Sequence, residues 1–396
     1  MNLRDLMRKA ETLSDYMTAL RRRIHQNPEL GFYEKETCAL VRKELSSCGV
    51  VLAPLEVEAG VVGLLQGRGP GPGTVTALRA DMDALPIPEK TGLPYASRNP
   101  GVMHACGHDG HVAMLLGAAR ILSETVDAFS GTVKFLFQPA EELLTGARKM
   151  IESNCLKNPQ VDRLVAVHGW PDMEVGKIGV YPGPYMASAD RFEISIQGAG
   201  GHGGYPHRTR DPIIAAAHTV LALQSIISRE TDPLDQAVLS VCTVSAGNAF
   251  NVIPDQAVLG GPVRCLEGRV RADLHKKIRR VAESTPRAVG CEGRLDWTEL
   301  VGPLVNDPET IRMISEVGEA VLGDGSVERL PGPVMGSEDF AAYLEHVPRG
   351  ALFRVGLKGA GCEVKPLHQS GFDFNDDALP DGASVLAGFV LHFHGS

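Results

Sequence analysis

The strongest constraint on the fold is an alternation of short apolar segments with helical patterns along the first part of the chain. The apolar segments have strand length, and between them apolar residues recur at helical spacing. Buried apolar strands that alternate with helices predict an α/β fold with a mostly parallel sheet. The predicted strands are 61–66, 74–78, 132–137 and 164–167, and the predicted helices are 3–24, 34–46, 112–123 and 147–152.

A different pattern interrupts this alternation from about Ala187. Phe192, Ile194 and Ile196 alternate with polar residues, which predicts a strand with one buried face. The strands and helices that follow have the order βαββαβ, typical of a ferredoxin-like unit. Because the chain of 396 residues exceeds the roughly 250–300 residues at which one core stops growing, two domains are expected. We expect a discontinuous core domain over 1–186 and 302–396, and an inserted lid over 187–301.

Composition and charge narrow the class of protein. Hydrophobic residues make up 43% of the chain and charged residues 22%, which is typical of globular proteins and excludes a disordered or fibrous class. The net charge is −9, and we interpret the short basic run Arg21, Arg22 and Arg23 as a solvated helix face. Neither a nucleic-acid partner nor a membrane is expected, since no uninterrupted apolar run approaches ~18 residues.

The cysteines bear on the compartment. The eight cysteines, of which Cys362 is the last, follow no spacing of a disulfide framework, and the N-terminus has no apolar signal core. We therefore expect a cytoplasmic protein in a reducing environment.

One short stretch gathers metal-capable side chains. Residues 103–111 follow a Pro- and Gly-rich approach and precede an apolar helical run, so they are expected to form a loop that enters a helix. Thiolate and imidazole together suit Zn, Co, Ni or similar ions, which predicts a metal site. The side chains in question are His104, Cys106, His108 and His111.

Other residues that can bind a metal ion or transfer a proton follow the predicted strands directly. They are expected at the edge of the sheet where open α/β folds bind their ligands. Paired glutamates are often plain surface charge, but at a strand end one can bind metal while the other moves protons. For each histidine, a structural role and a ligand role both stay open. A serine hydrolase is a poor alternative, because Gly-x-Ser-x-Gly is absent. The residues are Asp81, Asp83, Glu141, Glu142 and His168, with His368 further along the chain.

Seven motifs together resemble the M20 metallopeptidase family. The closest similarity is to its amidohydrolase branch, which includes aminoacylases, hippurate hydrolase and the plant indoleacetyl-amino acid hydrolases. The resemblance covers nearly the whole chain, in the right order. The motifs are RADMDALP (79–86), MHACGHDGH (103–111), QPAEE (138–142), GGHGGYPH (200–207), NVIP (251–254), GSEDF (336–340) and LH (367–368).

The resemblance implies a metal-dependent amidohydrolase that cleaves N-acyl-amino acids to a carboxylic acid and a free amino acid. It implies two divalent ions per subunit (Zn, Mn, Co or Ni) and Glu141 as the general base and then acid. Asp81 would orient a ligand imidazole, or be a structural carboxylate, and His104 and His111 would be supporting residues. The implied metal ligands are Cys106, His108, Glu142, His168 and His368.

In the inserted lid, His202 lies among glycines that let a loop approach a ligand closely; the alternative is a flexible surface histidine. The resemblance implies that His202 stabilises the oxyanion in a partner subunit's site, and that the chain is a homodimer through the lid. It implies that Asn251 and Arg264 hold the substrate's carboxylate. The chain departs from the family at Pro262, where threonine is usual, and at 143–145, where a glycine-rich turn is usual.

Two other functions fit part of the pattern. A dipeptidase or N-carbamoyl-type amide hydrolase on the same scaffold would share the metals and differ in its pocket. A non-catalytic binding protein would be expected to lack the base or the ligands, and all of these residue types are present.

Overall fold

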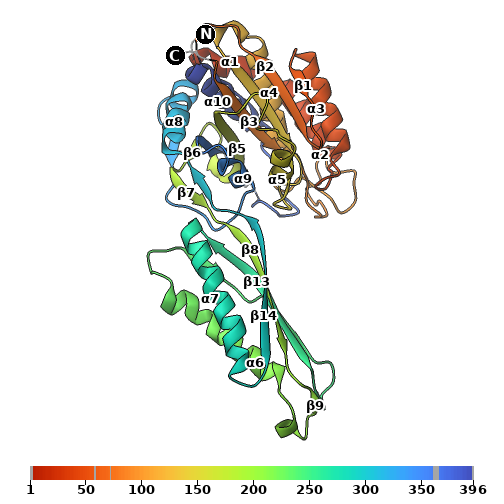
Figure 1. Ribbon diagram of the computed structural model, residues 1–396. Coiled ribbons are helices and arrows are strands. Elements are labelled where there is room, and N and C mark those ends of the chain that lie inside the picture. Colours follow the sequence, from red (N-terminus) through yellow and green to blue (C-terminus); the bar gives the residue numbers. More distant parts are fainter. Residues whose placement is uncertain (1–2, 58, 72, 360–364, 395–396) are drawn as a thin grey trace. The chain divides into compact units, whose positions relative to one another are not determined.

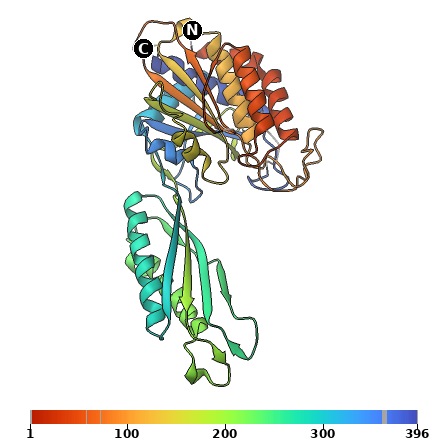
Figure 2. The ribbon, with the colours of Figure 1, turned by 45° about the vertical axis from the view of Figure 1, so that its right-hand side comes forward.

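The chain forms two compact units. A computed structural model describes residues 3–57, 59–71, 73–359 and 365–394 (Figures 1 and 2). Unit 1 comprises Met1–Gly183, Val305–Gly332 and Asp339–Ser396, and unit 2 comprises Pro184–Leu304 and Pro333–Glu338. The short segment Pro333–Glu338, which the sequence pattern assigns to the first domain, belongs to unit 2. It is held there because the N–H of Ala187 donates to the carbonyl of Gly336 at 2.8 Å.

Unit 1 is built on an eight-stranded sheet with the order β1-β2-β4-β3-β5-β17-β6-β16. The central pairs β4–β3, β3–β5 and β5–β17 are parallel, whereas β1–β2 and β2–β4 are antiparallel. The predicted α/β class with a mostly parallel sheet is therefore confirmed. The strands are β1 (Val51–Ala53), β2 (Val61–Gln66), β3 (Val75–Asp81), β4 (Thr132–Gln138), β5 (Arg163–Glu174), β6 (Ile178–Val180), β16 (Val327–Arg329) and β17 (Gly350–Lys358).

Helices cover this sheet and supply the core of unit 1. Figure 2 shows helices lying against the sheet of unit 1. The apolar faces of α1, α2, α4, α8 and α10 pack together with alternate residues of β3, β4, β5 and β17. The smaller helices α5 and α9 pack against each other. The bounds are α1 (Arg4–Thr12), α2 (Ser14–Gln26), α3 (Lys35–Ser47), α4 (His108–Ser123), α5 (Gly146–Glu152), α8 (Pro308–Leu322), α9 (Phe340–Leu344) and α10 (Leu379–His394).

Two expectations about the N-terminal region were wrong. The predicted single helix over 3–24 is two helices, because the chain breaks at Leu13, whose N–H donates to the carbonyl of Ala10. The basic run is not wholly a solvated face, since Arg21 is fully buried. Its guanidinium pairs with Asp109 at 3.0 Å and with two carboxylates near the C-terminal helix, Asp373 and Asp376. These partners are remote in sequence, so the local pattern could not reveal them.

Unit 2 is a ferredoxin-like α+β unit, as predicted. Its antiparallel sheet has the order β10-β13-β8-β14, with β11 also paired to β13, and α6 and α7 pack side by side on it. The alternating residues Phe192, Ile194 and Ile196 of β8 are buried, as expected. The bounds are β8 (Ala189–Gln197), β9 (Gly201–His202), α6 (Pro212–Ser225), β10 (Ala237–Leu239), β11 (Thr243–Ala246), β12 (Val252–Ile253), β13 (Gln256–Cys265), α7 (Gly268–Arg287) and β14 (Glu292–Val301).

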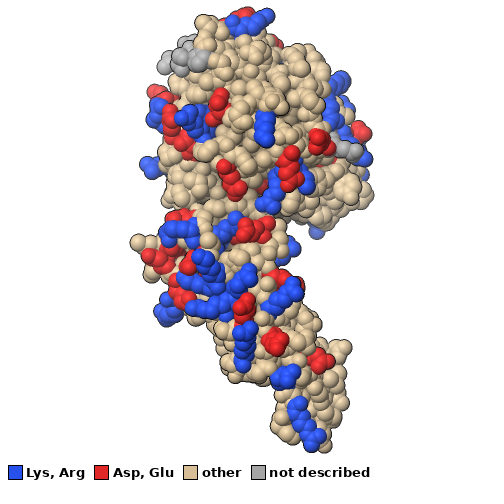
Figure 3. Space-filling view, in the orientation of Figure 1, with Lys and Arg blue, Asp and Glu red and all other residues tan. Residues whose placement is uncertain are grey.

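The surface of unit 2 carries both charged and apolar side chains. Lys and Arg gather over α7 (Figure 3), where Arg269 pairs with Asp235 and Arg280 pairs with Glu230. Among the described residues, one helical stretch, Pro212–Glu230, is long and apolar enough by length and composition to cross a membrane. Part of this stretch packs against β8, β13 and α7, and the expectation of no membrane partner stays a prediction.

The described cysteines carry no disulfide bond. Seven of the eight cysteines are free thiols, and Cys362 lies outside the described residues. The cytoplasmic location stays a prediction.

Candidate metal centre

The candidate site lies beside β5, where the parallel strands β3 and β4 end and α4 begins. β3 ends at Asp81, β4 ends at Gln138, and His168 lies within β5 beyond the last β3–β5 pair, Arg79↔Ala166. α4 starts after Gly107, which has φ +85°, a conformation that glycine adopts without steric cost. The helix start therefore presents Cys106 and His108 to the strand ends.

The five residues that the resemblance implies as ligands converge on Cys106. Its thiol belongs to two groups of ligand atoms, and within each group the atoms lie within 4.8 Å of one another. The first group adds His108 and His168, and Cys106 Sγ lies 3.5 Å from His168 Nε2. The second group adds Glu142 and His368, with His368 Nε2 3.3 Å from both Cys106 Sγ and a Glu142 oxygen.

The residues present fit divalent cations. The buried His108 Nε2 atom has no hydrogen-bond partner within the described part of the chain. It lies 4.0 Å from a carboxylate oxygen of Glu141 and 4.0 Å from one of Glu142, so this ring nitrogen faces acidic groups across a gap. Buried polar groups normally have partners. Soft thiolate, imidazole and carboxylate together suit Zn, Co, Ni or Mn better than Mg or Ca.

The electrostatics of the cluster also favour positive charge. Hydrogen bonds to Cys106 and Glu142 raise the pKa of His368 to about 10. Burial by itself lowers the pKa of His108, but the Asp81 carboxylate and Cys106 outweigh it and raise the pKa. Burial and the neighbouring His111 lower the pKa of His168, which keeps this imidazole neutral and able to bind metal. Burial raises the pKa of the Cys106 thiol, so a nearby cation would be needed to hold it as thiolate.

The residue that orients His108 is Asp83, which was expected at the edge of the sheet but without a specific role. His108 Nδ1 lies 2.9 Å from the Asp83 carbonyl and 3.3 Å from the Asp83 carboxylate. The same carboxylate accepts the backbone N–H groups of Glu141 at 3.0 Å and Glu142 at 2.9 Å. Asp83 therefore fixes an imidazole and the two glutamates at once. Its place two residues after Asp81 at a strand end was the available signal.

Asp81, which was expected either to orient a ligand imidazole or to be a structural carboxylate, contacts His111 and Arg79 most closely. Its Oδ1 lies 2.6 Å from His111 Nδ1 and its Oδ2 accepts from Arg79 at 2.6 Å, while His108 Nε2 is 3.8 Å away. His111 packs beside His168 with ring centroids 4.6 Å apart. The buried His104 makes no hydrogen bond through either ring nitrogen to the described residues, and burial lowers its pKa to about 4.

Glu141 lies at the edge of the same cluster. It is mostly buried, and one of its oxygens accepts the backbone N–H of Asp339 at 3.4 Å. The Asp339 carboxylate in turn accepts from Arg79 and from both the Gln138 amide and the Ala147 N–H. The buried Asp339 thus holds the chain both before Glu141, through Gln138, and after it, through Ala147.

The three residues predicted in the lid are not all brought together within unit 2. His202 and Asn251 lie at one end of its sheet, where β9 pairs with β12 and the N–H of Gly203 donates to the Asn251 carbonyl at 2.8 Å. Arg264 lies at the other end of β13, roughly 25 Å away at about 3.3 Å per residue. Its guanidinium donates to Ser337, near the points where the chain enters and leaves the unit.

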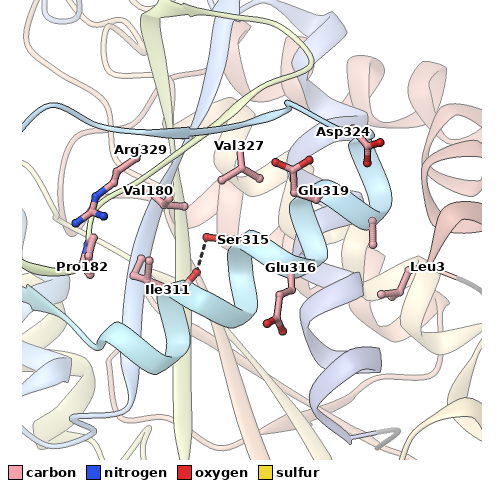
Figure 4. A pocket seen from close by; sticks show the side chains of 11 residues that line it. Leu3, Val180, Pro182, Ile311, Ser315, Glu316, Glu319, Asp324, Val327 and Arg329 are labelled. Atoms are coloured by element: carbon pink, nitrogen blue, oxygen red, sulfur yellow. Dashed lines mark hydrogen bonds between the residues drawn. The ribbon is translucent and has the colours of Figure 1, made fainter.

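Cavity size alone does not mark the site. A cavity of about 760 Å³ in unit 1 lies between α8, β6 and β16. Figure 4 shows that its walls carry apolar side chains with Glu316, Glu319, Asp324 and Arg329. None of the residues around Cys106 lines it.

A comparison with protein families shows the family to which the chain belongs. The profile of Peptidase family M20/M25/M40 matches residues 77–392, which include the Cys106 cluster, all of unit 2 and most of unit 1. The chain belongs to this family. The predicted M20 resemblance is confirmed.

Individual relatives of the M20 family agree with this assignment. N-acetyl-L-cysteine deacetylase of Bacillus subtilis is 41% identical over 86% of this chain and 80% of its own length. IAA-amino acid hydrolase ILR1-like 2 of Arabidopsis thaliana is 40% identical over 97% of this chain and 87% of its own. A solved dinuclear metal binding peptidase of the M20 family from Bacillus subtilis has a TM-score of 0.85 and 35% identity, covering 97% of this chain and 99% of that one. The chain is therefore a metal-dependent amidohydrolase of the M20 family, as the motifs predicted.

Proposed function

We propose that the chain hydrolyses the amide bond of N-acyl-amino acids, releasing a carboxylic acid and a free amino acid. The observation that carries the proposal is the position of Cys106 in two ligand groups, with Glu141 beside them. Relatives that act on an N-acetylated and on an indoleacetylated amino acid, at about 40% identity over most of the chain, support this substrate class.

The ligand set that we propose would hold two divalent ions, with Cys106 shared between them. His108 and His168 would complete one site, and Glu142 and His368 would complete the other. When bound, the ions would polarise the amide carbonyl and lower the pKa of water in the site. Asp83 would keep the Nδ1 proton of His108 engaged, which leaves Nε2 free to bind.

In the proposed mechanism Glu141 moves the proton. It lies next to the ligands but belongs to neither group around Cys106. Its carboxylate would take a proton from the attacking water and return it to the nitrogen of the departing amino acid. The hydrogen bond from the Asp339 N–H would hold one of the two carboxylate oxygens in place.

His202 is suited to donate a hydrogen bond to an oxyanion. The backbone N–H of Gly204 donates to His202 Nδ1 at 3.0 Å, so the ring proton of the neutral imidazole resides on Nε2. The side chain is exposed. A fixed donor of this kind is worth roughly 3 kcal/mol in a transition state. We assign the carboxylate of the substrate to Asn251 and Arg264, since guanidinium pairs well with carboxylate.

We propose that the chain forms a homodimer through unit 2, and the placement of these residues and the surface of the unit support this proposal. His202 and Asn251 lie beyond one end of β13 and Arg264 lies near its other end, so two copies of the unit would be needed to bring both groups to one substrate. Ile214 and Leu221 of α6 are exposed, as is Val244 of the edge strand β11. Exposed apolar side chains and an open strand edge are features of association surfaces.

A substrate panel with metal analysis tests the proposed function. The purified protein should contain about two divalent ions per subunit and release amino acid from acetyl-, benzoyl- or longer acyl-amino acids. A chelator should abolish turnover, and adding the ion back should restore it. Hydrolysis of dipeptides or N-carbamoyl-amino acids without hydrolysis of acyl-amino acids would favour the alternative functions on the same scaffold.

Subunit mixing tests the shared site. The variants His202→Ala and Glu141→Gln should each be inactive, but mixed dimers should regain part of the activity because one intact site forms. Mass spectrometry can establish that mixed dimers are present. Mixed dimers without activity would contradict a site shared between subunits.

A further inference from the structure

His111 is a buried imidazole beside the cluster, and the structure defines its tautomer. The backbone N–H of Gly169 donates to His111 Nε2 at 2.8 Å. An amide N–H can only donate, so Nε2 carries no proton and Nδ1 does. Nδ1 lies 2.6 Å from the Asp81 carboxylate, which accepts that proton. The ring is therefore neutral, with an acceptor aimed at β5 and a donor aimed at Asp81.

The Gly169 amide needs this acceptor because the sheet does not supply one. β3 pairs with β5 only as far as Arg79↔Ala166, so the ladder on that side ends before Gly169. A buried backbone N–H without a partner is costly, because the group gives up its hydrogen bond to water and gains none in return. His111, one turn into α4, supplies the hydrogen-bond acceptor that a continued β3 strand would otherwise supply.

Gly169 in turn controls the ring of His168. His168 Nδ1 lies 2.8 Å from the Gly169 carbonyl, so this nitrogen donates its proton there. His168 Nε2 is then unprotonated and faces Cys106 Sγ at 3.5 Å. The position of Gly169 is further restricted by packing, since a Cβ at this residue would lie 2.8 Å from Phe374 and 2.9 Å from Leu357. A shift of this backbone would move the His168 nitrogen that faces the cluster.

We propose that His111 is a positioning residue that aims His168 at the metal centre by holding the Gly169 amide. This inference rests on the proposed function in one respect, the assignment of His168 as a metal ligand. His111 itself binds no metal in this scheme, because both of its nitrogens are engaged in hydrogen bonds. Its contribution is measured through metal affinity.

Two amide substitutions separate the two contacts of the ring. In His111→Gln the side-chain oxygen reaches the position of Nε2 and can accept from Gly169, whereas the contact with Asp81 is lost. In His111→Asn the side-chain NH₂ occupies the position of Nδ1 and can donate to Asp81, whereas Gly169 loses its acceptor. Asp81 keeps its ion pair with Arg79 in both variants.

The measurement is the dissociation constant for Co²⁺, obtained by chelator competition on metal-free protein. We expect His111→Asn to weaken the binding of one ion by about 10–100-fold, the range typical when a group behind a metal ligand is removed. We expect His111→Gln to stay within about threefold of the unmodified protein. Equal weakening in both variants, or unchanged affinity in His111→Asn, would overturn the inference.

Two controls keep this test decisive. His168→Ala should lose one ion; if it retains both, the ligand assignment fails and the proposed function is at fault rather than His111. Thermal unfolding of the metal-free variants separates positioning from a general loss of stability, which would affect both variants alike.

Should both variants fail to fold, the ¹⁵N chemical shifts of the histidine rings in the unmodified metal-free protein test the inference instead. A proton on Nδ1 alone at His111 supports the inference, and a proton on Nε2 overturns it.

Discussion

Glu34 Oε1 accepts a hydrogen bond of 2.8 Å from the backbone N–H of Ala140, the residue that directly precedes the proposed base. Ala140 has φ +54°, a conformation that is costly for a residue with a side chain. Glu34 is fully buried, and burial raises its pKa to about 8. A buried carboxyl group from the start of α3 thus holds the loop that carries Glu141 and Glu142.

This relationship predicts the effect of substitutions at Glu34. Glu34→Ala should lower kcat by about 10–100-fold, because misplacement of a reacting group by about 1 Å can cost two orders of magnitude. Glu34→Gln retains an oxygen acceptor of nearly the same shape and should keep most of the activity. Steady-state kinetics on both variants, with metal content measured in parallel, checks this. A loss of metal in Glu34→Ala would mean that Glu34 acts through Glu142 and not through the base.

The neighbouring glutamates should respond differently to the same substitution. Glu141→Gln should retain two ions per subunit and lose about 10²–10⁴-fold in kcat, since it removes only the group proposed to move the proton. Glu142→Gln should lose metal, because Glu142 lies in the second ligand group with Cys106 and His368. Atomic absorption and turnover on the two variants make a matched comparison. Near-normal turnover in Glu141→Gln would refute its assignment as the base.

The sequence predicted the features of this protein that depend on local periodicity. Strands such as β3 and β5 were found because a buried parallel strand is a short, continuous apolar run. The residues around Cys106 could be selected because they follow such strands, and parallel strands end at one edge of a sheet.

Features that depend on long-range packing were not predicted. Asp81 and Asp83 are two residues apart, and their different contacts follow from the strand ending at Asp81, a boundary that periodicity places only within a few residues. Arg21 was predicted to be exposed because its carboxylate partners lie 88 or more residues away in the sequence and leave no local signal. The role of Glu34 depends on a backbone N–H, which leaves no trace in side-chain chemistry.

The shared position of Cys106 predicts an unequal effect of ligand substitutions. Cys106→Ser should weaken the binding of both ions, because the thiol belongs to both ligand groups, whereas His368→Ala should weaken only one. In Co²⁺-loaded protein the sulfur-to-metal charge-transfer band should disappear in Cys106→Ser and persist in His368→Ala. Metal titration followed by absorbance measures both effects. A cysteine variant that still binds one ion with unchanged affinity would contradict a bridging thiolate.

The buried ionisable groups His25 and Asp109, together with Glu89, predict how stability depends on pH. His25 Nδ1 lies 2.8 Å from Asp109, and Nε2 lies 3.3 Å from Glu89. Burial alone lowers the pKa of His25, but Asp109 and Glu89 outweigh it and raise the pKa to about 9. Because the folded state holds the proton more tightly than the unfolded state, the stabilisation is complete below about pH 6.5 and is lost as the pH rises through about 9.

Across this window the free energy of unfolding of unit 1 should fall by about 3 kcal/mol through His25 alone. Urea unfolding between pH 6 and pH 10 measures it, with Trp297→Phe as the background so that Trp170 in unit 1 is the remaining tryptophan reporter. His25→Gln in the same background should be less stable at pH 6 and should lack this part of the pH dependence, because an amide does not titrate. Parallel pH profiles for the two proteins would show that the protonated His25 does not stabilise the fold.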